Sequence, residues 1–252
     1  MTQNLLKGAQ YLLTGFNIIT KPGIRLFVII PLIVNILLFT LLFIFARHYI
    51  NEFNAWFTGY LPSWLAWLSV ILWCLFVVSF FLIMVYTFTL IANAISAPFN
   101  GFLSEKVEMY LTGKTQDPRT LAQNIKDIPR ILGRQFSILI YYLPRVLALL
   151  LLFFIPVIQV FAAILWFLFH AWFMAMIYID YPTDNHRINM ITVRQWMSEN
   201  RALMLGFGLS VLTATLIPIL NFVTIPAAVA GATALWIDTR SPEKRSSVCP
   251  GQ

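Results

Sequence analysis

The stretch Lys21-Pro22-Gly23-Ile24-Arg25 introduces an apolar run, residues 26–46, that contains 21 residues and no charge. A helix of that length spans about 30 Å, which is roughly the hydrocarbon thickness of a bilayer. Pro22 suits the first turn of a helix, and Gly23 lets another group approach the backbone closely. The free N–H groups at such a helix start, together with the guanidinium of Arg25, favour an anion. The stretch therefore predicts a transmembrane helix whose start is either an anion site or an anchor to lipid headgroups.

Composition places the whole chain in the membrane class. Of its 252 residues, 60% are hydrophobic and 11% are charged, and the mean hydropathy is +0.79. Soluble domains average about 25% charged residues, so we expect an integral membrane protein. A net charge of +7 then sets the topology and attracts anionic lipids, and no nucleic-acid partner is expected. The two cysteines form neither a disulfide framework nor a metal site, and no cofactor is expected.

The charge pattern predicts an all-α fold organised as a single membrane domain over residues 1–252. Two long transmembrane helices are expected, together with two partly penetrating helical hairpins and amphipathic cytoplasmic helices. Helical spacing of apolar residues over 1–20 indicates an interfacial helix with Lys7 in the headgroups. The predicted segments are an interfacial helix (1–20), a first span (26–46), a second span (65–91), a charged helical region (99–145), hairpin 1 (146–179), hairpin 2 (202–237) and a tail (238–252). The phrase Ala97-Pro98-Phe99-Asn100-Gly101 is expected to end the second span.

Two late apolar blocks carry the hairpin prediction. Residues 146–179 and 202–237 are each too long for one comfortable span and too short for two spans with a turn. Each is broken by a proline followed by an amide side chain, at Pro156 and at Pro218, and Pro226 breaks the second block again. Halves of about 15 residues reach only about 20 Å, so each block is predicted to enter the bilayer and return on the same side. A kinked full span for each block is the alternative.

Topology follows from the positions of the cations. If the hairpins return to their own side, sixteen of the seventeen Lys and Arg residues share the side of both termini, and only Arg47 does not. The positive-inside rule makes that shared side cytoplasmic.

The charged segments offer few signs of catalysis. The chain lacks P-loop, G-x-S-x-G and H-E-x-x-H motifs, so an enzyme is not expected. The cluster Asp180-Tyr181-Pro182-Thr183-Asp184-Asn185-His186 could ligate a metal or serve acid–base catalysis, or it could be a capped, salt-bridged turn. Lys126, Arg130 and Arg134 are spaced four apart, which fits a headgroup-facing stripe or the lining of an anion path.

Proline followed by arginine recurs along the chain. Ile128-Pro129-Arg130 and Leu143-Pro144-Arg145 repeat the pattern of residues 22–25, and each proline is predicted to start a helix with an arginine in its first turn. Cations at three helix starts favour anionic neighbours, which could be phospholipid headgroups.

Five phrases together resemble the CysZ-type sulfate permease family over about residues 8–240. They are 21–25, 97–101, Lys126-Asp127-Ile128-Pro129-Arg130, Tyr142-Leu143-Pro144-Arg145 and 180–186, in the family's order and spacing. The resemblance implies a multi-pass protein of the bacterial inner membrane that admits sulfate for cysteine biosynthesis and works as a homo-oligomer. It also implies that sulfate binds at Gly23, Ile24 and Arg25. Some members carry a second arginine after the first, and here Leu26 occupies that position.

Sulfate suits a site of this composition. It is a dianion with acceptors only, which backbone N–H groups and an arginine can satisfy completely. No coupling machinery is recognisable, so a channel-like, gradient-driven route is favoured over ion-coupled transport. Polar residues of several copies are expected to line the path: Asn93, Asn100, Lys126, Arg130, Arg134 and Arg145. A membrane scaffold or lipid-binding protein would explain the same cations without transport.

Overall fold

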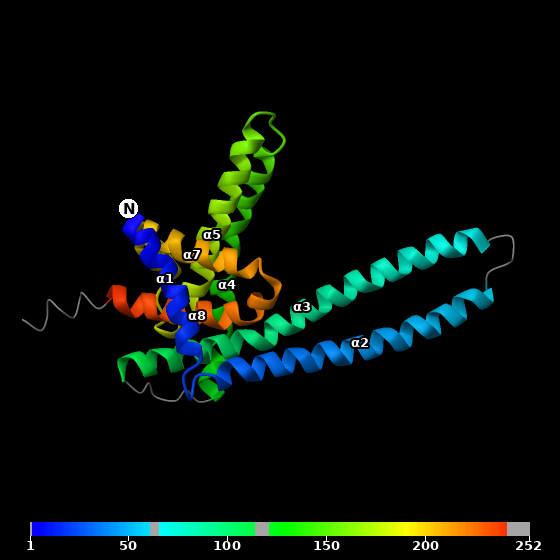
Figure 1. The fold of residues 1–252 in the computed structure, drawn as a ribbon, viewed down its shortest axis with the longest axis horizontal. Coiled ribbons are helices and arrows are strands. Elements are labelled where there is room, and N and C mark those ends of the chain that lie inside the picture. The colour runs from blue at the N-terminus through cyan, green and yellow to red at the C-terminus, as the bar shows by residue number, and fades with distance from the viewer. Residues whose placement is uncertain (1, 61–65, 114–120, 241–252) are drawn as a thin grey trace, which may run out of the picture. The chain divides into compact units, whose positions relative to one another are not determined.

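The computed structural model describes residues 2–60, 66–113 and 121–240, and these residues fold into α-helices joined by short connections. Their bounds are α1 (Thr2–Ile19), α2 (Leu26–Tyr60), α3 (Ala66–Thr112), α4 (Leu121–Leu152), α5 (Ile158–Asn185), α6 (Met190–Glu199), α7 (Arg201–Thr215) and α8 (Pro218–Arg240) (Figure 1). The all-α prediction is confirmed. Within the described ranges, five helices are long and apolar enough to cross a membrane: α2, α3, α4, α5 and α8.

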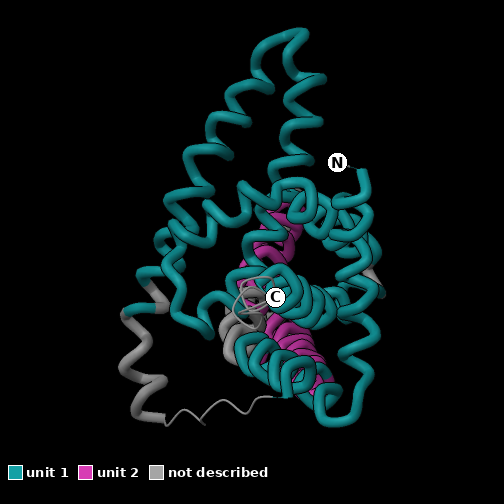
Figure 2. Tube along the Cα trace, turned by 90° about the vertical axis from the view of Figure 1, so that its left-hand side faces the viewer, with its two compact units in different colours: residues 1–28, 100–252 teal, residues 29–99 magenta. Residues whose placement is uncertain are grey.

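The chain divides into two compact units (Figure 2). Unit 2 comprises residues 29–99 and contains most of α2 and the first part of α3. The two helices contact each other at Phe39 and Phe88, whose rings pack edge to face with their centroids 5.7 Å apart. The most apolar stretches of both helices, within 25–50 and 70–88, contain no buried residue. Unit 2 itself therefore does not bury the apolar surfaces of these two stretches.

Both helices of unit 2 are longer than the spans predicted from charge. α2 continues from Ala46 to Tyr60, because a charge such as Arg47 ends the membrane-embedded part of a helix without ending the helix. α3 runs without interruption from Ala66 to Thr112, so the predicted end of the helix at residues 97–101 is wrong. A proline in a helix of a membrane protein is tolerated when neighbouring groups satisfy the carbonyl that it leaves free. α3 ends at Thr112, where Gly113 follows with φ +67° and donates to the Met109 carbonyl.

Unit 1 comprises residues 1–28 and 100–252, and its core forms where α1, α5, α7 and α8 cross at close range. Glycines make these crossings possible. A Cβ on Gly8 would lie 2.2 Å from the Leu203 carbonyl oxygen, and one on Gly15 would lie 1.9 Å from that of Ala227. Gly208 meets the backbone of α5 in the same way. Small residues that let helix backbones touch are the usual interface of membrane helices.

The first helix packs on the rest of unit 1 through one face. α1 packs against α7 and α8, and its buried face contains Gly8, Tyr11, Leu12 and Gly15, whereas the apolar side chains of Leu6 and Leu13 are exposed. The predicted interfacial position of this helix, with Lys7 in the headgroups, stays a prediction. Two of the six buried positions of α1 are glycines, which carry no hydrophobic side chain, so apolar spacing alone does not reveal this face.

Each of the two late apolar blocks is divided between two helices. α4 ends at Leu152 and α5 begins at Ile158, on either side of Pro156, and the two helices run antiparallel (Figure 1). α7 and α8 are likewise separated at residues 216–217. The halves of hairpin 1 are longer than predicted, because α4 and α5 extend beyond the uncharged block to 32 and 28 residues. Pro226 lies inside α8 rather than ending it, so that second predicted break is wrong. The depth to which either hairpin enters the bilayer stays a prediction.

Candidate functional site

The turn between α1 and α2 contains the predicted anion site. Gly23 has φ +87°, a left-handed conformation that only glycine adopts readily, and a Cβ there would meet nothing within 4 Å. Glycine is therefore required here by the backbone angle rather than by a crowded neighbour. Ile24 is 3% exposed and belongs to the core of unit 1, whereas Gly23 and Arg25 are exposed. One buried side chain thus anchors a turn whose polar groups face outward.

The hydrogen bonds of this turn leave donors free. The N–H groups of Ile24 and Arg25 both donate to the Lys21 carbonyl, at 3.1 and 3.2 Å. The N–H groups of Gly23 and Leu26 have no acceptor within the described residues, and Arg25 forms no ion pair there. The helix proper begins at Leu26, so Arg25 directly precedes it. Two free amides, one guanidinium and the positive end of a helix dipole are all groups that attract an oxyanion.

The cationic stripe on α4 forms a separate structure. Arg134 is buried and donates to the Asp180 carboxylate at 2.6 Å, to the Thr183 hydroxyl at 2.7 Å and to the Ile188 carbonyl. Arg130 pairs with Asp184, which also lies 3.4 Å from Arg134. These two arginines and two aspartates hold the base of α4 against the end of α5. Their charges are already balanced within the protein.

The segment 180–186 was predicted to be either a salt-bridged turn or a reactive cluster. Its ion pairing is confirmed, but residues 180–185 form the end of α5, with Pro182 inside the helix, and His186 caps it, so the predicted turn is wrong. His186 contacts Glu108 of α3 at 2.8 Å. Within the described residues, no group of three or more His, Cys, Asp or Glu side chains could hold a metal ion.

The remaining predicted path residues are dispersed. The Asn100 amide donates to the Tyr181 hydroxyl at 3.2 Å. The Arg145 guanidinium lies over the Tyr141 ring, with Cζ 3.7 Å from its centroid. The side chains of Asn93 and Lys126 lie outside the described residues. Of the four predicted residues whose side chains are described, only Arg130 and Arg134 are brought together.

Arg194 is a residue that sequence reasoning missed. It lies on α6, donates to the Ser137 hydroxyl of α4 at 2.7 Å, and places Cζ 5.0 Å from the centroid of the Tyr141 ring. It therefore joins Arg145 at one aromatic side chain, although 49 positions separate the two arginines in the sequence. Only the packing of α6 against α4 brings them together, so no local pattern could have indicated the pair.

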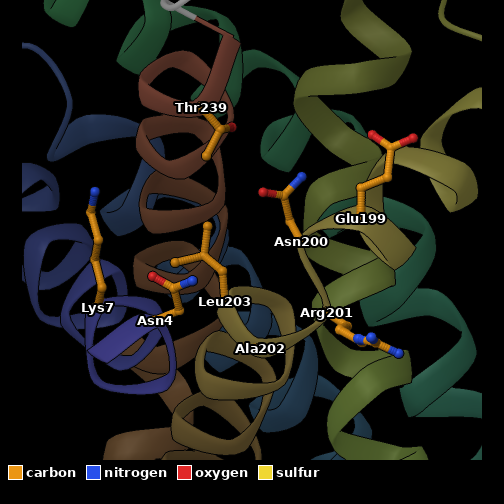
Figure 3. Close-up of a pocket in the computed structure, with 8 residues that line it drawn as sticks. All are labelled: Asn4, Lys7, Glu199, Asn200, Arg201, Ala202, Leu203 and Thr239. Atoms are coloured by element: carbon orange, nitrogen blue, oxygen red, sulfur yellow. The ribbon is translucent and has the colours of Figure 1, made fainter. Parts of the chain in front are cut away.

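A cavity of about 400 Å³ lies elsewhere in unit 1, where the start of α1 faces the α6–α7 junction (Figure 3). Figure 3 shows Asn4 and Lys7 of α1 on one side of it and Asn200 on the other, with Thr239 of α8 at one end. The other lining residues are Glu199, Arg201, Ala202 and Leu203. None of these was predicted to bind sulfate, and the cavity contains neither Gly23 nor Arg25.

Comparison with known proteins identifies the family. Residues 11–226 match the family model described as "Sulfate transporter CysZ/Etoposide-induced protein 2.4". The chain belongs to this family. It is 46% identical over 233 residues to the sulfate transporter CysZ of Pseudomonas aeruginosa PAO1, covering 92% of this chain and 95% of that protein. It is 43% identical over 239 residues to the Salmonella typhimurium LT2 protein of the same name, covering 92% of each. The predicted family resemblance is confirmed.

Proposed function

We propose that this chain admits sulfate across the bacterial inner membrane and so supplies sulfur for cysteine biosynthesis. The observation that carries the proposal is its 46% identity, over 92% of its length, to relatives named sulfate transporters. The five helices long and apolar enough to cross a membrane agree with a multi-pass inner-membrane protein. Because the relatives are named as transporters, we do not assign an enzymatic reaction.

We propose the turn Gly23-Ile24-Arg25 as the sulfate site. Its free amides at Gly23 and Leu26, and the exposed guanidinium of Arg25, are all donors. Sulfate has only acceptors and can use every one of them, whereas a protonated phosphate also needs an acceptor that the turn does not offer. One guanidinium without a fixed carboxylate partner binds strongly enough to select the dianion and weakly enough to release it. These properties suit gradient-driven, channel-like conduction, with ion-coupled transport as the alternative.

We propose that several copies assemble around the path, with both termini in the cytoplasm and both hairpins returning to that side. Unit 2 leaves the apolar surfaces of α2 and α3 uncovered, which suits contact with other copies as well as lipid. The tip of hairpin 1, residues 153–157, leaves backbone groups that a hydrocarbon environment alone cannot satisfy. Light scattering of the purified protein in detergent measures the number of copies, and a monomer would contradict the assembly.

Sulfate uptake into liposomes that contain only this protein tests the function directly. We expect labelled sulfate to enter down its gradient without an added energy source. Protein-free liposomes, and liposomes with the Arg25→Ala variant, are the controls. Absence of uptake by the native chain under an imposed sulfate gradient, and under imposed proton and sodium gradients as well, would contradict the proposal.

Calorimetric titration with sulfate tests the site separately. Hydrogen bonds to charged groups contribute about 1.5–3 kcal/mol, so Arg25→Ala should weaken sulfate binding by about one to two orders of magnitude. Arg25→Lys should restore part of the affinity, because an ammonium cannot make the bidentate contact. Lys7→Ala, which removes an exposed cation of α1, is the matched control and should leave the affinity unchanged. If Arg25→Ala binds sulfate as well as the native chain does, the site lies elsewhere.

A further inference from the structure

Two arginines converge on the ring of Tyr141 in unit 1. Arg145, one turn further along α4, lies 3.7 Å from the ring centroid, and Arg194 of α6 lies 5.0 Å from it. The ring itself is held in place, because the indole N–H of Trp172 on α5 donates to its hydroxyl at 3.1 Å. Ser137, one turn before Tyr141, accepts from Arg194 at 2.7 Å. Three helices therefore fix the positions of two cations at one aromatic side chain.

Neither cation of this cluster has a carboxylate partner in the described part of the chain. The acidic residues of α5, Asp180 and Asp184, form ion pairs with Arg130 and Arg134. The quadrupole of one ring attracts each guanidinium but does not remove the repulsion between two of them. An anion bound between them would remove it.

Both guanidiniums also have more N–H groups than they use in hydrogen bonds to the described residues. Each has five N–H bonds, of which Arg145 uses one side-chain nitrogen to bond the Tyr141 carbonyl, and Arg194 uses one to bond Ser137. The Nε of Arg194 is buried and has no hydrogen-bond acceptor. A buried donor without an acceptor is costly, and a ligand oxygen would satisfy it. The cluster thus lacks both negative charge and hydrogen-bond acceptors.

From this geometry we propose that Arg145 and Arg194 bind a tetrahedral oxyanion, a phosphate or sulfate group. Both Cζ atoms lie within 5.0 Å of one ring centroid, and the proposed group accepts hydrogen bonds from both guanidinium forks. Arg145 is exposed and lies within residues 133–152 of α4, a stretch apolar enough to span a membrane. Its exposed apolar neighbours are Phe136, Leu139, Ile140, Leu143 and Leu147. The group can therefore come from a phospholipid headgroup on the lipid side or from free sulfate on the aqueous side.

Titration of two ligands into the full-length protein in neutral detergent tests this site. One ligand is a water-soluble short-chain phosphatidylglycerol, and the other is sodium sulfate. All proteins carry Arg25→Ala, so that binding at the proposed transport site does not contribute. The test variant is Arg145→Gln with Arg194→Gln, and the matched control is Arg240→Gln, which removes a single arginine stacked on a single ring, that of Trp236, at 4.4 Å.

We expect the double Gln variant to weaken binding of at least one ligand tenfold or more, and the control to change it less than twofold. Weaker binding of the lipid alone identifies a headgroup site, and weaker binding of sulfate identifies a free-oxyanion site. The variant with both arginines replaced by lysine keeps the charge and should show intermediate affinity. It provides the test if the Gln variant aggregates. Unchanged affinity in the folded Gln or Lys variant, or no binding of either ligand before substitution, would overturn the site. Sulfate uptake is measured separately with Arg25 intact, so the two proposals can fail independently.

Discussion

Replacing Arg134 with methionine should destabilise the protein more than any loss of surface charge. Its side chain is 7% exposed, and it is the ion-pair partner of Asp180, whose side chain is 11% exposed. Without Arg134, the Asp180 carboxylate remains buried and unpaired. Breaking a buried pair in this way costs about 3–5 kcal/mol, a large share of the roughly 5–15 kcal/mol by which folded proteins are stable. The loss should appear in the free energy of unfolding measured in mixed micelles.

Adding Asp180→Asn to Arg134→Met should restore much of that stability. The second change removes the stranded charge and leaves a neutral amide of similar shape. Recovery should be incomplete, because the Ile188 carbonyl still lacks its donor, at a cost of about 1–3 kcal/mol. The Thr183 hydroxyl is affected less, since it also donates to the Ile179 carbonyl of its own helix. The double variant should therefore lie between the single variant and the native chain.

A surface pair provides the control for this cycle. His48 and Glu52 lie 3.2 Å apart on α2 with side chains 65% and 63% exposed, so His48→Gln should cost less than about 1 kcal/mol. Two results would refute the reasoning: a cost for Arg134→Met no larger than that of His48→Gln, or a double variant no more stable than the single one. The double variant also distinguishes a structural role of Arg134 from a role in the sulfate path. If it is folded and transports sulfate normally, Arg134 is structural and does not line the path.

Two further predictions concern α1 and the topology. Burial and the hydrogen bond from Tyr11 to the Asp238 carboxylate, at 3.0 Å, raise the pKa of Tyr11 from 10.0 to about 12. A raised pKa stabilises the fold below pH 10, and this contribution is lost as the pH rises from about 10 towards 12, so Tyr11→Phe should flatten the fall in thermal stability over that interval. In a background with both native cysteines replaced by serine, Arg201→Cys should react with an impermeant thiol reagent only from the cytoplasmic side, and Arg47→Cys only from the outer side. Labelling of both from one side would contradict the proposed topology.

The breaks in the fold were predictable where proline coincided with the middle of a long apolar block. Pro156 and Pro218 marked both hairpins, because a helix that reverses direction within an apolar block needs a residue that ends it. The prediction that Pro129 and Pro144 start helices is wrong, because both prolines lie inside α4. A proline removes one hydrogen bond, and whether that ends the helix depends on the packing around it. Sequence alone does not contain that packing.

The core of unit 1 was harder to predict for a related reason. Hydrophobic periodicity locates faces that bury large side chains, whereas α1 meets its neighbours through Gly8 and Gly15. These glycines are seven residues apart, which places them on one face of a helix. Their spacing was the feature of the sequence that could have indicated the buried face. Their partners, such as Gly206 and Gly231, lie about 200 residues away in sequence, so the crossing itself could not be predicted.

The contacts of the arginines explain why the cations in the sequence suggest more residues of an anion path than the structure supports. From sequence, Arg130 and Arg134 looked as available as Arg25, since all three lie near apolar runs. In the structure the first two meet carboxylates 54 and 46 positions further along the chain, and a guanidinium already engaged by a carboxylate offers little net charge to a passing dianion. Arg25, by contrast, forms no ion pair with the described residues. The cations to test for anion binding are therefore those that folding leaves without a carboxylate, and this property depends on tertiary contacts rather than on spacing.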